Sequence, residues 1–358
     1  MKKLLALLLA LMMVLSLAAC AKDEAPADEP ADAPADAPAD APADDAADAP
    51  APELAAWEEA IAGDFVLAGD EAFDVAFINQ SYTDKFTMRV MAACKAYFDE
   101  SYPNCNWLEG DGEFDPNIQI GLAENYLAQG VDVIILNPCD SQACGSVCGI
   151  CKEANTPLVT PNSQIDCGDA TCTHYFVGSD HFYAGQLQAE FLMETLPSGD
   201  EPVKLCYLEG TNGFVHTTLR IAGFFDTLDA AGYNYELLSS LEGEYMRDKG
   251  LQIAEDWFTK YGDEIDAIAP SNDEMIWGAL EAMKGAGISG VVLMGIDAND
   301  DTKQAVVDGE ISMTVCQNAE GQGKWDAIQA YNACLGMEDN VIDVPYERVD
   351  PTNVADYM

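Results

Sequence analysis

Side chains that can form two hydrogen bonds at once recur where short apolar runs of the sequence end. Asp, Asn, Gln and Arg have such planar, two-pronged ends. They gather at 79–86, 161–163, 209–213 with Arg220 beyond it, 272–274, 297–300 and 316–318. Because each hydroxyl group both donates and accepts, these side chains suit a polyhydroxylated ligand. Phe86 and Tyr245 add aromatic faces against which the apolar C–H face of a sugar ring can lie.

The apolar runs that precede these polar segments predict the elements that position them. Buried strands are predicted at 75–78, 131–136, 158–160, 175–177, 203–208, 265–269, 291–296 and 311–315, with amphipathic helices between them. Continuous apolar strands that alternate with helices indicate parallel sheets covered on both faces. The units are too many for one ordinary doubly wound sheet, so the predicted fold class is α/β with two lobes. Ligands of such sheets bind beyond the carboxyl ends of the strands, where the polar segments lie.

The charge of the chain excludes several classes of partner. The sequence has 63 Asp and Glu against 16 Lys and Arg, a formal net charge of −47 over 358 residues. A nucleic-acid site needs clustered Lys and Arg, so no nucleic-acid partner is expected. Electrostatic docking on an anionic membrane surface is excluded for the same reason. A hydrophobic content of 49% still predicts a folded, two-domain protein.

The first 20 residues predict export. Lys2 and Lys3 precede an apolar run at 4–14, and small residues come before Cys20. This pattern describes a secretory signal, and the run is shorter than the roughly 20 residues of a membrane span. The sequence LAAC ending at Cys20 resembles the lipobox of bacterial lipoproteins. That resemblance implies a signal peptide at 1–19 and lipidation of Cys20, whereas an ordinary signal peptide with an incidental Cys is the alternative.

Residues 20–53 are predicted to be a tether. From 21 to 53 the chain repeats Ala-Pro-Ala-Asp and holds 11 acidic residues against one Lys, a net charge of −10. Such a segment has no apolar face to bury and repels itself, so it stays extended. After it, Trp57, Ile61 and Phe65 could line one helical face, but Gly63 and Gly69 interrupt the pattern. The pattern is therefore ambiguous, and residues 54–72 are interpreted as a poorly defined lead-in.

Several motifs resemble those of the bacterial sugar-binding proteins of ABC importers, the ribose and galactose/glucose type. They are LNPCDS at 136–141, RIAGF at 220–224, NDEM at 272–275 followed by Gly278, and VLMGID at 292–297. The resemblance implies a type I periplasmic binding protein, with two Rossmann-like doubly wound parallel lobes joined by a three-strand hinge around a sugar cleft. It implies one lobe at 73–178 plus 318–345 and the other at 179–317 plus 346–358.

The same resemblance implies the ligand contacts. They fall on Asp84, Phe86, Asn162, Arg220, Tyr245, Asn272, Asp297 and Gln317, with His216 and Trp277 as weaker candidates. Each has a structural alternative. The Asp and Asn side chains could cap helices or form turns, Arg220 could make a surface ion pair, and Tyr245 could simply pack.

The expected ligand is a neutral sugar, with a hexopyranose such as galactose or glucose favoured over ribose. The ribose-type pattern has paired aromatics after the first strand and Asp-Arg after the fourth, where this chain has Phe86-Thr87 and Asn162-Ser163. The pair of Asp84 and Asn162 resembles the galactose/glucose proteins more closely. Two carboxylates, those of Asp84 and Asp297, face one Arg in the implied site, so an acidic sugar would leave uncompensated buried charge.

The resemblance also implies the partners and the place of action. A lipid anchor would hold the exported protein at the outer face of the cytoplasmic membrane, or on its periplasmic side. There it would act as a monomer and deliver its sugar to an ABC importer permease, and a chemoreceptor or sensor is the alternative partner. The acidic calcium loop of the galactose/glucose proteins is not matched at 196–203, and neither a metal site nor a cofactor is expected.

The 11 cysteines that follow Cys20 allow more than one interpretation. Cys144, Cys148 and Cys151 have helical spacing but no nearby His, which favours small buried side chains over metal ligands. Cys167 and Cys172 could close a small disulfide loop in a protein outside the cytosol. Spacing alone does not determine connectivity.

An enzyme is the competing class, and the sequence disfavours it. No Gly-x-Gly-x-x-Gly follows a strand, and no Gly-Lys-Ser/Thr phosphate loop occurs. The chain has three His and lacks a nucleophile elbow, so no triad is predicted. A sugar-processing enzyme with two catalytic carboxylates is the remaining alternative, because sequence does not test their separation.

Overall fold

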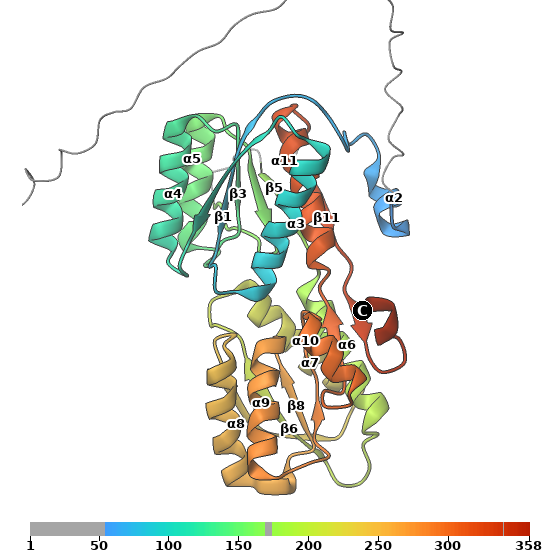
Figure 1. Cartoon of the computed structure of the whole chain (residues 1–358). Coiled ribbons are helices and arrows are strands. Elements are labelled where there is room, and N and C mark those ends of the chain that lie inside the picture. The colour runs from blue at the N-terminus through green and yellow to red at the C-terminus, as the bar shows by residue number, and fades with distance from the viewer. Residues whose placement is uncertain (1–53, 169–173, 339) are drawn as a thin grey trace, which may run out of the picture. The chain divides into compact units, whose positions relative to one another are not determined.

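The computed structural model describes residues 54–168, 174–338 and 340–358 (Figure 1). The predicted signal peptide, the predicted lipidation site Cys20, the predicted tether and Cys172 lie outside the described residues. Within the described part of the chain, no helix combines the length and the apolar character needed to cross a membrane.

Helices and strands alternate along the described chain. The helices are α2 (Ala56–Ala62), α3 (Lys85–Ser101), α4 (Pro116–Gln129), α5 (Ser146–Ala154), α6 (His181–Thr195), α7 (Val215–Ala230), α8 (Arg247–Tyr261), α9 (Asp273–Ala286), α10 (Asp300–Val307) and α11 (Ala319–Cys334), with short 3₁₀ turns at Ala143–Gly145, Gly262–Glu264 and Val354–Tyr357. The strands are β1 (Asp74–Asn79), β2 (Asn106–Asp111), β3 (Val133–Leu136), β4 (Leu158–Pro161), β5 (His174–Gly178), β6 (Val203–Glu209), β7 (Tyr235–Glu242), β8 (Ala267–Pro270), β9 (Val292–Leu293), β10 (Thr314–Cys316), β11 (Val341–Asp343) and β12 (Glu347–Val349).

The first lobe is built on a six-stranded parallel sheet in the order β11-β5-β4-β3-β1-β2. Successive side chains of a strand point to opposite faces. Val75 and Phe77 of β1 accordingly pack in a core with α3 and α11, whereas Ala76 and Ile78 pack in a second core with α4 and α5. Figure 1 shows these two helix pairs on opposite sides of the sheet.

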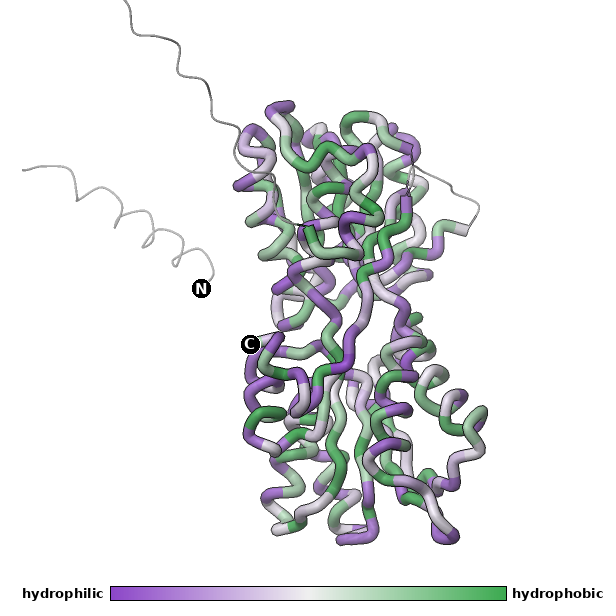
Figure 2. The backbone as a smooth tube through the Cα atoms, turned by 90° about the vertical axis from the view of Figure 1, so that its right-hand side faces the viewer, coloured by the Kyte–Doolittle hydropathy of each residue, from purple (hydrophilic) through white to green (hydrophobic). Residues whose placement is uncertain are grey.

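The second lobe repeats this arrangement around a four-stranded parallel sheet in the order β7-β6-β8-β9. Leu205 and Tyr207 of β6 pack with α6 and α7, while Cys206 and Leu208 pack with α8 and α9. Figure 2 shows hydrophobic residues along the strands inside the lobes and hydrophilic residues on the outer turns.

Three chain segments connect the two lobes, between β5 and α6, between β10 and α11, and between β11 and β12. The last of these leads from β11, which pairs with β5 of the first sheet, to β12, which pairs antiparallel with β10. The predicted fold class, α/β with two doubly wound parallel lobes, is confirmed.

Some elements were not predicted from the apolar pattern. β2 and β7 are edge strands with mostly half-exposed or exposed residues, so neither has a continuous apolar run. Helix α11 is buried nearly all round although it contains Gln322, Asp326 and Gln329, so it has no polar face to mark its period.

Residues 54–72, which the sequence left ambiguous, contain helix α2. Helix α2 packs on α11, where the Trp57 and Phe65 rings lie 6.3 and 5.4 Å from the Trp325 ring. The buried Glu58 carboxylate accepts a hydrogen bond from Trp325 Nε1 at 3.0 Å and pairs with Lys324 Nζ at 2.8 Å. Gly63, taken as an interruption, is the residue at which α2 ends. The partner that orders this segment lies more than 260 residues away in the chain.

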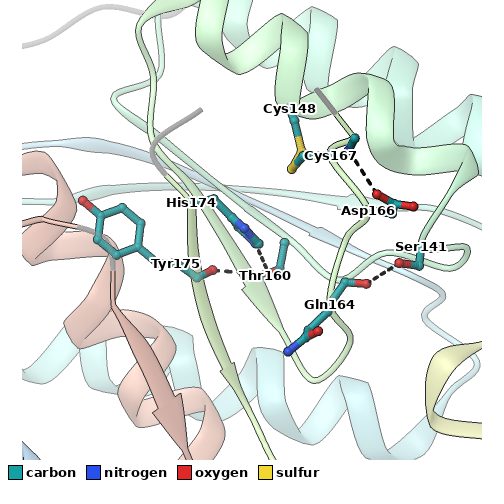
Figure 3. The surroundings of a disulfide bond; sticks show 9 residues. Ser141, Cys148, Thr160, Gln164, Asp166, Cys167, His174 and Tyr175 are labelled. Atoms are coloured by element: carbon teal, nitrogen blue, oxygen red, sulfur yellow. Dashed lines mark hydrogen bonds between the residues drawn. A yellow bond between two sulfur atoms is a disulfide. The ribbon is translucent and has the colours of Figure 1, made fainter. Parts of the chain in front are cut away.

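The suggested Cys167–Cys172 disulfide is also corrected by the structure, in which Cys167 is bonded to Cys148 (Figure 3). Their Cα atoms are 5.5 Å apart, within the usual range for a disulfide. Cys148 lies on the buried face of α5. The loop after β4 returns to the segment that leads into this helix, where Ser141 Oγ donates to Gln164 O at 2.7 Å and a Cβ atom on Gly145 would lie 2.2 Å from Asp166 O. Contact between α5 and this loop, rather than sequence proximity, therefore selects the pair.

Candidate ligand-binding site

Close helix packing in the second lobe positions Arg220. A Cβ atom on Gly223 would lie 1.9 Å from Phe182 O, and one on Gly185 would lie 2.1 Å from Arg220 O. Only glycine permits this approach of α6 and α7. The glycine of the RIAGF motif thereby fixes how closely α7 packs on α6, and with it the position of Arg220.

The NDEM motif is positioned in the same way. A Cβ atom on Gly278 would lie 2.2 Å from Arg247 O, so this glycine lets α9 pack directly on α8. Asn272 then caps α9, with its Oδ1 accepting a hydrogen bond from Met275 N at 3.1 Å. Asp84 similarly caps α3 by accepting from Thr87 N at 2.8 Å. The helix-cap alternative is correct for both residues, and both also line the cavity described next.

A cavity of about 550 Å³ lies between the lobes at the carboxyl ends of the strands. Five of the eight predicted contact residues line it: Asp84, Phe86, Tyr245, Asn272 and Asp297. A recess of about 30 Å³ is lined by all eight, adding Asn162, Arg220 and Gln317, and by His216. The structure thus brings together eight residues that span more than 230 positions of the sequence.

Trp277 is not part of this arrangement. Its ring packs at the edge of the second lobe's core, with Nε1 donating to Thr302 Oγ1 at 3.0 Å. The guanidinium of Arg247 lies 5.0 Å from the ring centroid. Trp277 lines neither the cavity nor the recess.

Arg220 organises the polar groups of the recess. Its guanidinium donates to Ser271 O at 2.5 Å, to Gln317 Oε1 at 2.7 Å and to the Tyr346 hydroxyl at 2.9 Å. Gln317 Nε2 donates in turn to Asn162 Oδ1 at 2.5 Å. The buried Nε–H of Arg220 has no partner among the described residues, so one strong donor is left for a ligand.

The carboxylates of Asp84 and Asp297 face the same cavity. Burial raises the pKa of Asp84, and hydrogen bonds from Thr87 and Gln80 only partly offset it. Burial and the neighbouring Asp273 raise the pKa of Asp297 well above its usual range, against the lowering effect of Arg220. No hydrogen-bond donor to the Asp297 carboxylate is found among the described residues, so a ligand hydroxyl can supply one.

Asp273 holds the loop that contains Asp297 through hydrogen bonds to its neighbours. Its carboxylate accepts from Thr314 Oγ1 at 2.7 Å and from Asn299 N at 2.8 Å. Burial raises the pKa of Asp273 to about 7. A Cβ atom on Gly295 would lie 2.2 Å from Asp273 Oδ1, so the glycine of VLMGID makes room for this carboxylate.

Two further residues of the site were missed in the sequence. His181 Nε2 contacts Asn162 O at 3.0 Å, and His181 Nδ1 contacts the Tyr346 hydroxyl at 2.9 Å. Burial and the charge of Arg220 lower the pKa of His181 to about 3, so its imidazole is neutral near pH 7. Both residues lie where the chain crosses between lobes, and the implied three-strand hinge was the one signal that pointed to these segments.

Contacts across the cleft hold the lobes together in this structure. Lys85 of the first lobe pairs with Glu274 of the second at 2.7 Å. Arg89 Nη1 donates to Asn299 Oδ1 at 3.3 Å, and Ser163 Oγ lies 3.1 Å from His216 Nδ1. His216, a weaker candidate from the sequence, is thus at a contact between the lobes.

Tyr245 forms part of the cavity wall. Its hydroxyl lies 2.6 Å from Thr217 Oγ1, and its ring is stacked near Phe214, with centroids 6.1 Å apart. A Cβ atom on Gly210 would lie 2.0 Å from the Tyr245 ring, so the glycine after β6 provides the space that the ring occupies. Together these neighbours fix the ring as a rigid apolar surface.

This fold and this site define a two-lobed solute-binding protein, and comparison with known proteins agrees. Residues 75–338 match the family described as periplasmic binding protein domain, and the chain belongs to this family. It is 30% identical over 240 residues to a putative rhizopine-binding protein of Rhizobium meliloti, covering 66% of this chain and 76% of that protein. It is 30% identical over 220 residues to the ribose import binding protein of Haemophilus influenzae, covering 62% and 72%.

Solved structures show the same similarity. An ABC transporter solute-binding protein from Bacillus halodurans with bound myo-inositol superimposes with a TM-score of 0.73 at 29% identity, covering 81% of this chain and 99% of that chain. The predicted family, the sugar-binding proteins of ABC importers, is thereby confirmed. Its members act outside the cytoplasm and bind their substrates rather than transforming them, so this protein is not an enzyme.

Proposed function

We propose that the protein captures a neutral six-membered polyhydroxylated ring between its lobes and delivers it to an ABC importer permease. The observation that carries the proposal is the convergence of Asp84, Asn272 and Asp297 on one cavity and on the small recess that Arg220 also lines. Two carboxylates and one guanidinium can bind several neighbouring hydroxyls, each hydrogen bond to a charged group contributing roughly 1.5–3 kcal/mol.

A hexopyranose such as galactose or glucose is the first candidate ligand. Asp84 and Asn162 supported this choice in the sequence, and both line the recess. The rings of Phe86 and Tyr245 lie on the cavity wall from opposite lobes and can cover the C–H faces of a sugar ring. The buried carboxylates favour a neutral ligand, because an anion would add a third negative charge beside Asp84 and Asp297.

A cyclitol is the second candidate. The structure from Bacillus halodurans that resembles this chain at 29% identity contains myo-inositol. A cyclitol has hydroxyl groups on all six ring carbons and no ring oxygen, so it differs from a hexopyranose at the edge of the ring.

Lipid anchoring through Cys20 would place the capture step at the membrane surface.

The proposed mechanism is closure of the lobes on the ligand. The cavity has walls from both lobes, so a bound ring makes contacts that neither lobe offers alone, which favours the closed state. The Lys85–Glu274 pair bridges the lobes beside the cavity.

Thermal unfolding of the purified folded part with galactose, glucose, ribose, allose and myo-inositol tests the proposal, followed by calorimetry of each hit. A ligand that binds only the native state raises the unfolding temperature. Stoichiometric binding of a neutral ring, with the ring recovered unchanged, is the expected result. Binding of none of these rings would contradict the proposal.

A further inference from the structure

The 550 Å³ cavity extends beyond the residues predicted to hold one sugar ring. Its wall also contains apolar side chains of both lobes: Phe114 and Pro116 from the first, Phe214 and Met246 from the second. Cavities of about 300–1,000 Å³ hold drug-sized ligands, which commonly have more than one ring. None of these four residues was implied as a contact for a single sugar.

Two of these apolar side chains are unusually exposed. Phe114 is 48% exposed and Met246 is 47% exposed, and they lie on opposite lobes along the wall of the same cavity. Exposed large apolar groups that gather at a cavity commonly mark a binding surface. A ring between them would remove apolar area from water on both of its faces.

The backbone is strained at Phe114 in the first lobe and directly before Met246 in the second. Glu113 and Phe114 have φ of 50° and 56°, and Glu244 and Tyr245 have φ of 53° and 61°. Consecutive non-glycine residues rarely adopt this left-handed conformation, and strain of this kind concentrates at ligand sites. Phe114 N donates to Gln80 O at 2.8 Å, which holds the first of these turns in place.

The charged residues that line the cavity disfavour an anionic ligand. Glu274 is neutralised by Lys85 at 2.7 Å and by Arg247 at 3.1 Å. These are the only Lys and Arg among the described residues that line the cavity, which also contains Asp140, Glu244 and Asp248. The surplus negative charge repels phosphate or carboxylate groups and leaves a neutral group with an apolar face as the fitting occupant.

We propose that the physiological ligand has two neutral rings, one polyhydroxylated ring held by Asp84, Asn272 and Asp297 and a second ring between Phe114 and Met246. This inference rests on the proposed function and names a narrower substrate class, disaccharides and aryl glycosides. The second ring makes mainly apolar contacts, so it adds affinity without changing the polar contacts of the first.

Calorimetry with matched probes tests the inference on the folded part, residues 54–358, in the wild type and in a Phe114→Ala/Met246→Ala variant. The single-ring probes are glucose and galactose. The two-ring probes are cellobiose, lactose and the phenyl β-glycosides of glucose and galactose. They distinguish a sugar ring from an aryl ring between Phe114 and Met246. Both substituted residues are about half exposed, so the variant is expected to fold, and thermal unfolding checks this.

We expect at least one two-ring probe to bind ten times or more tightly than its single-ring counterpart. The double variant should lose at least tenfold for that probe and stay within twofold for the single ring. Binding of single rings with equal or weaker binding of every two-ring probe would overturn the inference while leaving the proposed function intact. Binding of neither kind would reject both.

Discussion

Arg220 on α7 and Gln317 on the segment that crosses between the lobes are joined by a hydrogen bond of 2.7 Å from Nη2 to Oε1. Through Gln317 the guanidinium is also linked to Asn162, which follows β4 of the first lobe. One buried cation therefore connects the second lobe, a hinge segment and the first lobe at the recess. This link makes the recess sensitive to the shape of the Arg220 side chain as well as to its charge.

Arg220→Lys should therefore weaken binding of the ligand identified by the thermal screen by about 1.5–3 kcal/mol, because an ammonium group cannot reproduce the guanidinium fork. Calorimetry measures the loss. The matched control is Arg348→Lys, whose side chain pairs at the surface with Glu194 at 2.8 Å and lines neither cavity. Equal affinity of Arg220→Lys and wild type for the ligand would show that the Arg220 guanidinium does not contribute to binding.

Asp297→Asn should also weaken ligand binding by about 1.5–3 kcal/mol, since an amide is a weaker acceptor for a ligand hydroxyl than a carboxylate. Stability should not fall, because burial already raises the pKa of Asp297 and disfavours its charge. Asp256→Asn, an exposed change on α8, is the control. If calorimetry gives the same affinity for both variants, the Asp297 carboxylate does not contact the ligand.

Gly210→Ala should lower affinity at least tenfold with little loss of stability. The new Cβ atom would lie 2.0 Å from the Tyr245 ring and force it out of its position on the cavity wall. Gly199→Ala is the matched control, because nothing lies within 4 Å of a Cβ atom at that position. Tight binding by Gly210→Ala would show that the ring position of Tyr245 is not needed.

The stability of the folded part should fall as the pH rises from about 4 to 7, and Asp273→Asn should reduce that fall. Burial raises the pKa of Asp273 to about 7, so the folded state holds a proton that the unfolded state has released above its ordinary pKa of 3.8. Ionisation of this group then costs up to about 1.4 kcal/mol per pH unit in that window. Urea unfolding at pH 5 and pH 7 measures the slope.

An asparagine resembles the neutral acid, since its amide can accept from Asn299 N and donate to Thr314 Oγ1. Asp263→Asn, an exposed change, should leave the slope as it is in the wild type. The same slope in Asp273→Asn and wild type would place the titration elsewhere.

Replacing both Cys148 and Cys167 with Ser should destabilise the first lobe by about 3 kcal/mol, the loop-closure contribution expected for a disulfide of this span. The two residues are 19 positions apart. Peptide mapping without reduction should recover them in one linked pair, and urea unfolding measures the loss. A map that links Cys167 to another cysteine would contradict the structure.

The fold and much of the cavity wall could be predicted because they depend on local patterns. Buried parallel strands have continuous apolar runs, and the side chains at their carboxyl ends meet at one edge of the sheet. This pattern predicts the polar segments 79–86, 272–274 and 297–300, and the family resemblance implies Asp84, Asn272 and Asp297 within them. Edge strands such as β2 and β7 carry no such run, and α11 is too deeply buried to show a helical period.

The sequence by itself determined the α/β class, the polar character of the strand ends and a charge balance that favours a neutral ligand. Each of these follows from residue types at short range. Only the tertiary structure decided that Cys148 pairs with Cys167, that α2 packs on Trp325, that Trp277 lines neither the cavity nor the recess, and that Phe114 and Met246 line the same cavity. These relationships join residues up to 268 positions apart, from Trp57 to Trp325, and are set by how closely the helices and lobes pack. That closeness depends on contacts such as Gly223 against Phe182, which no local pattern specifies.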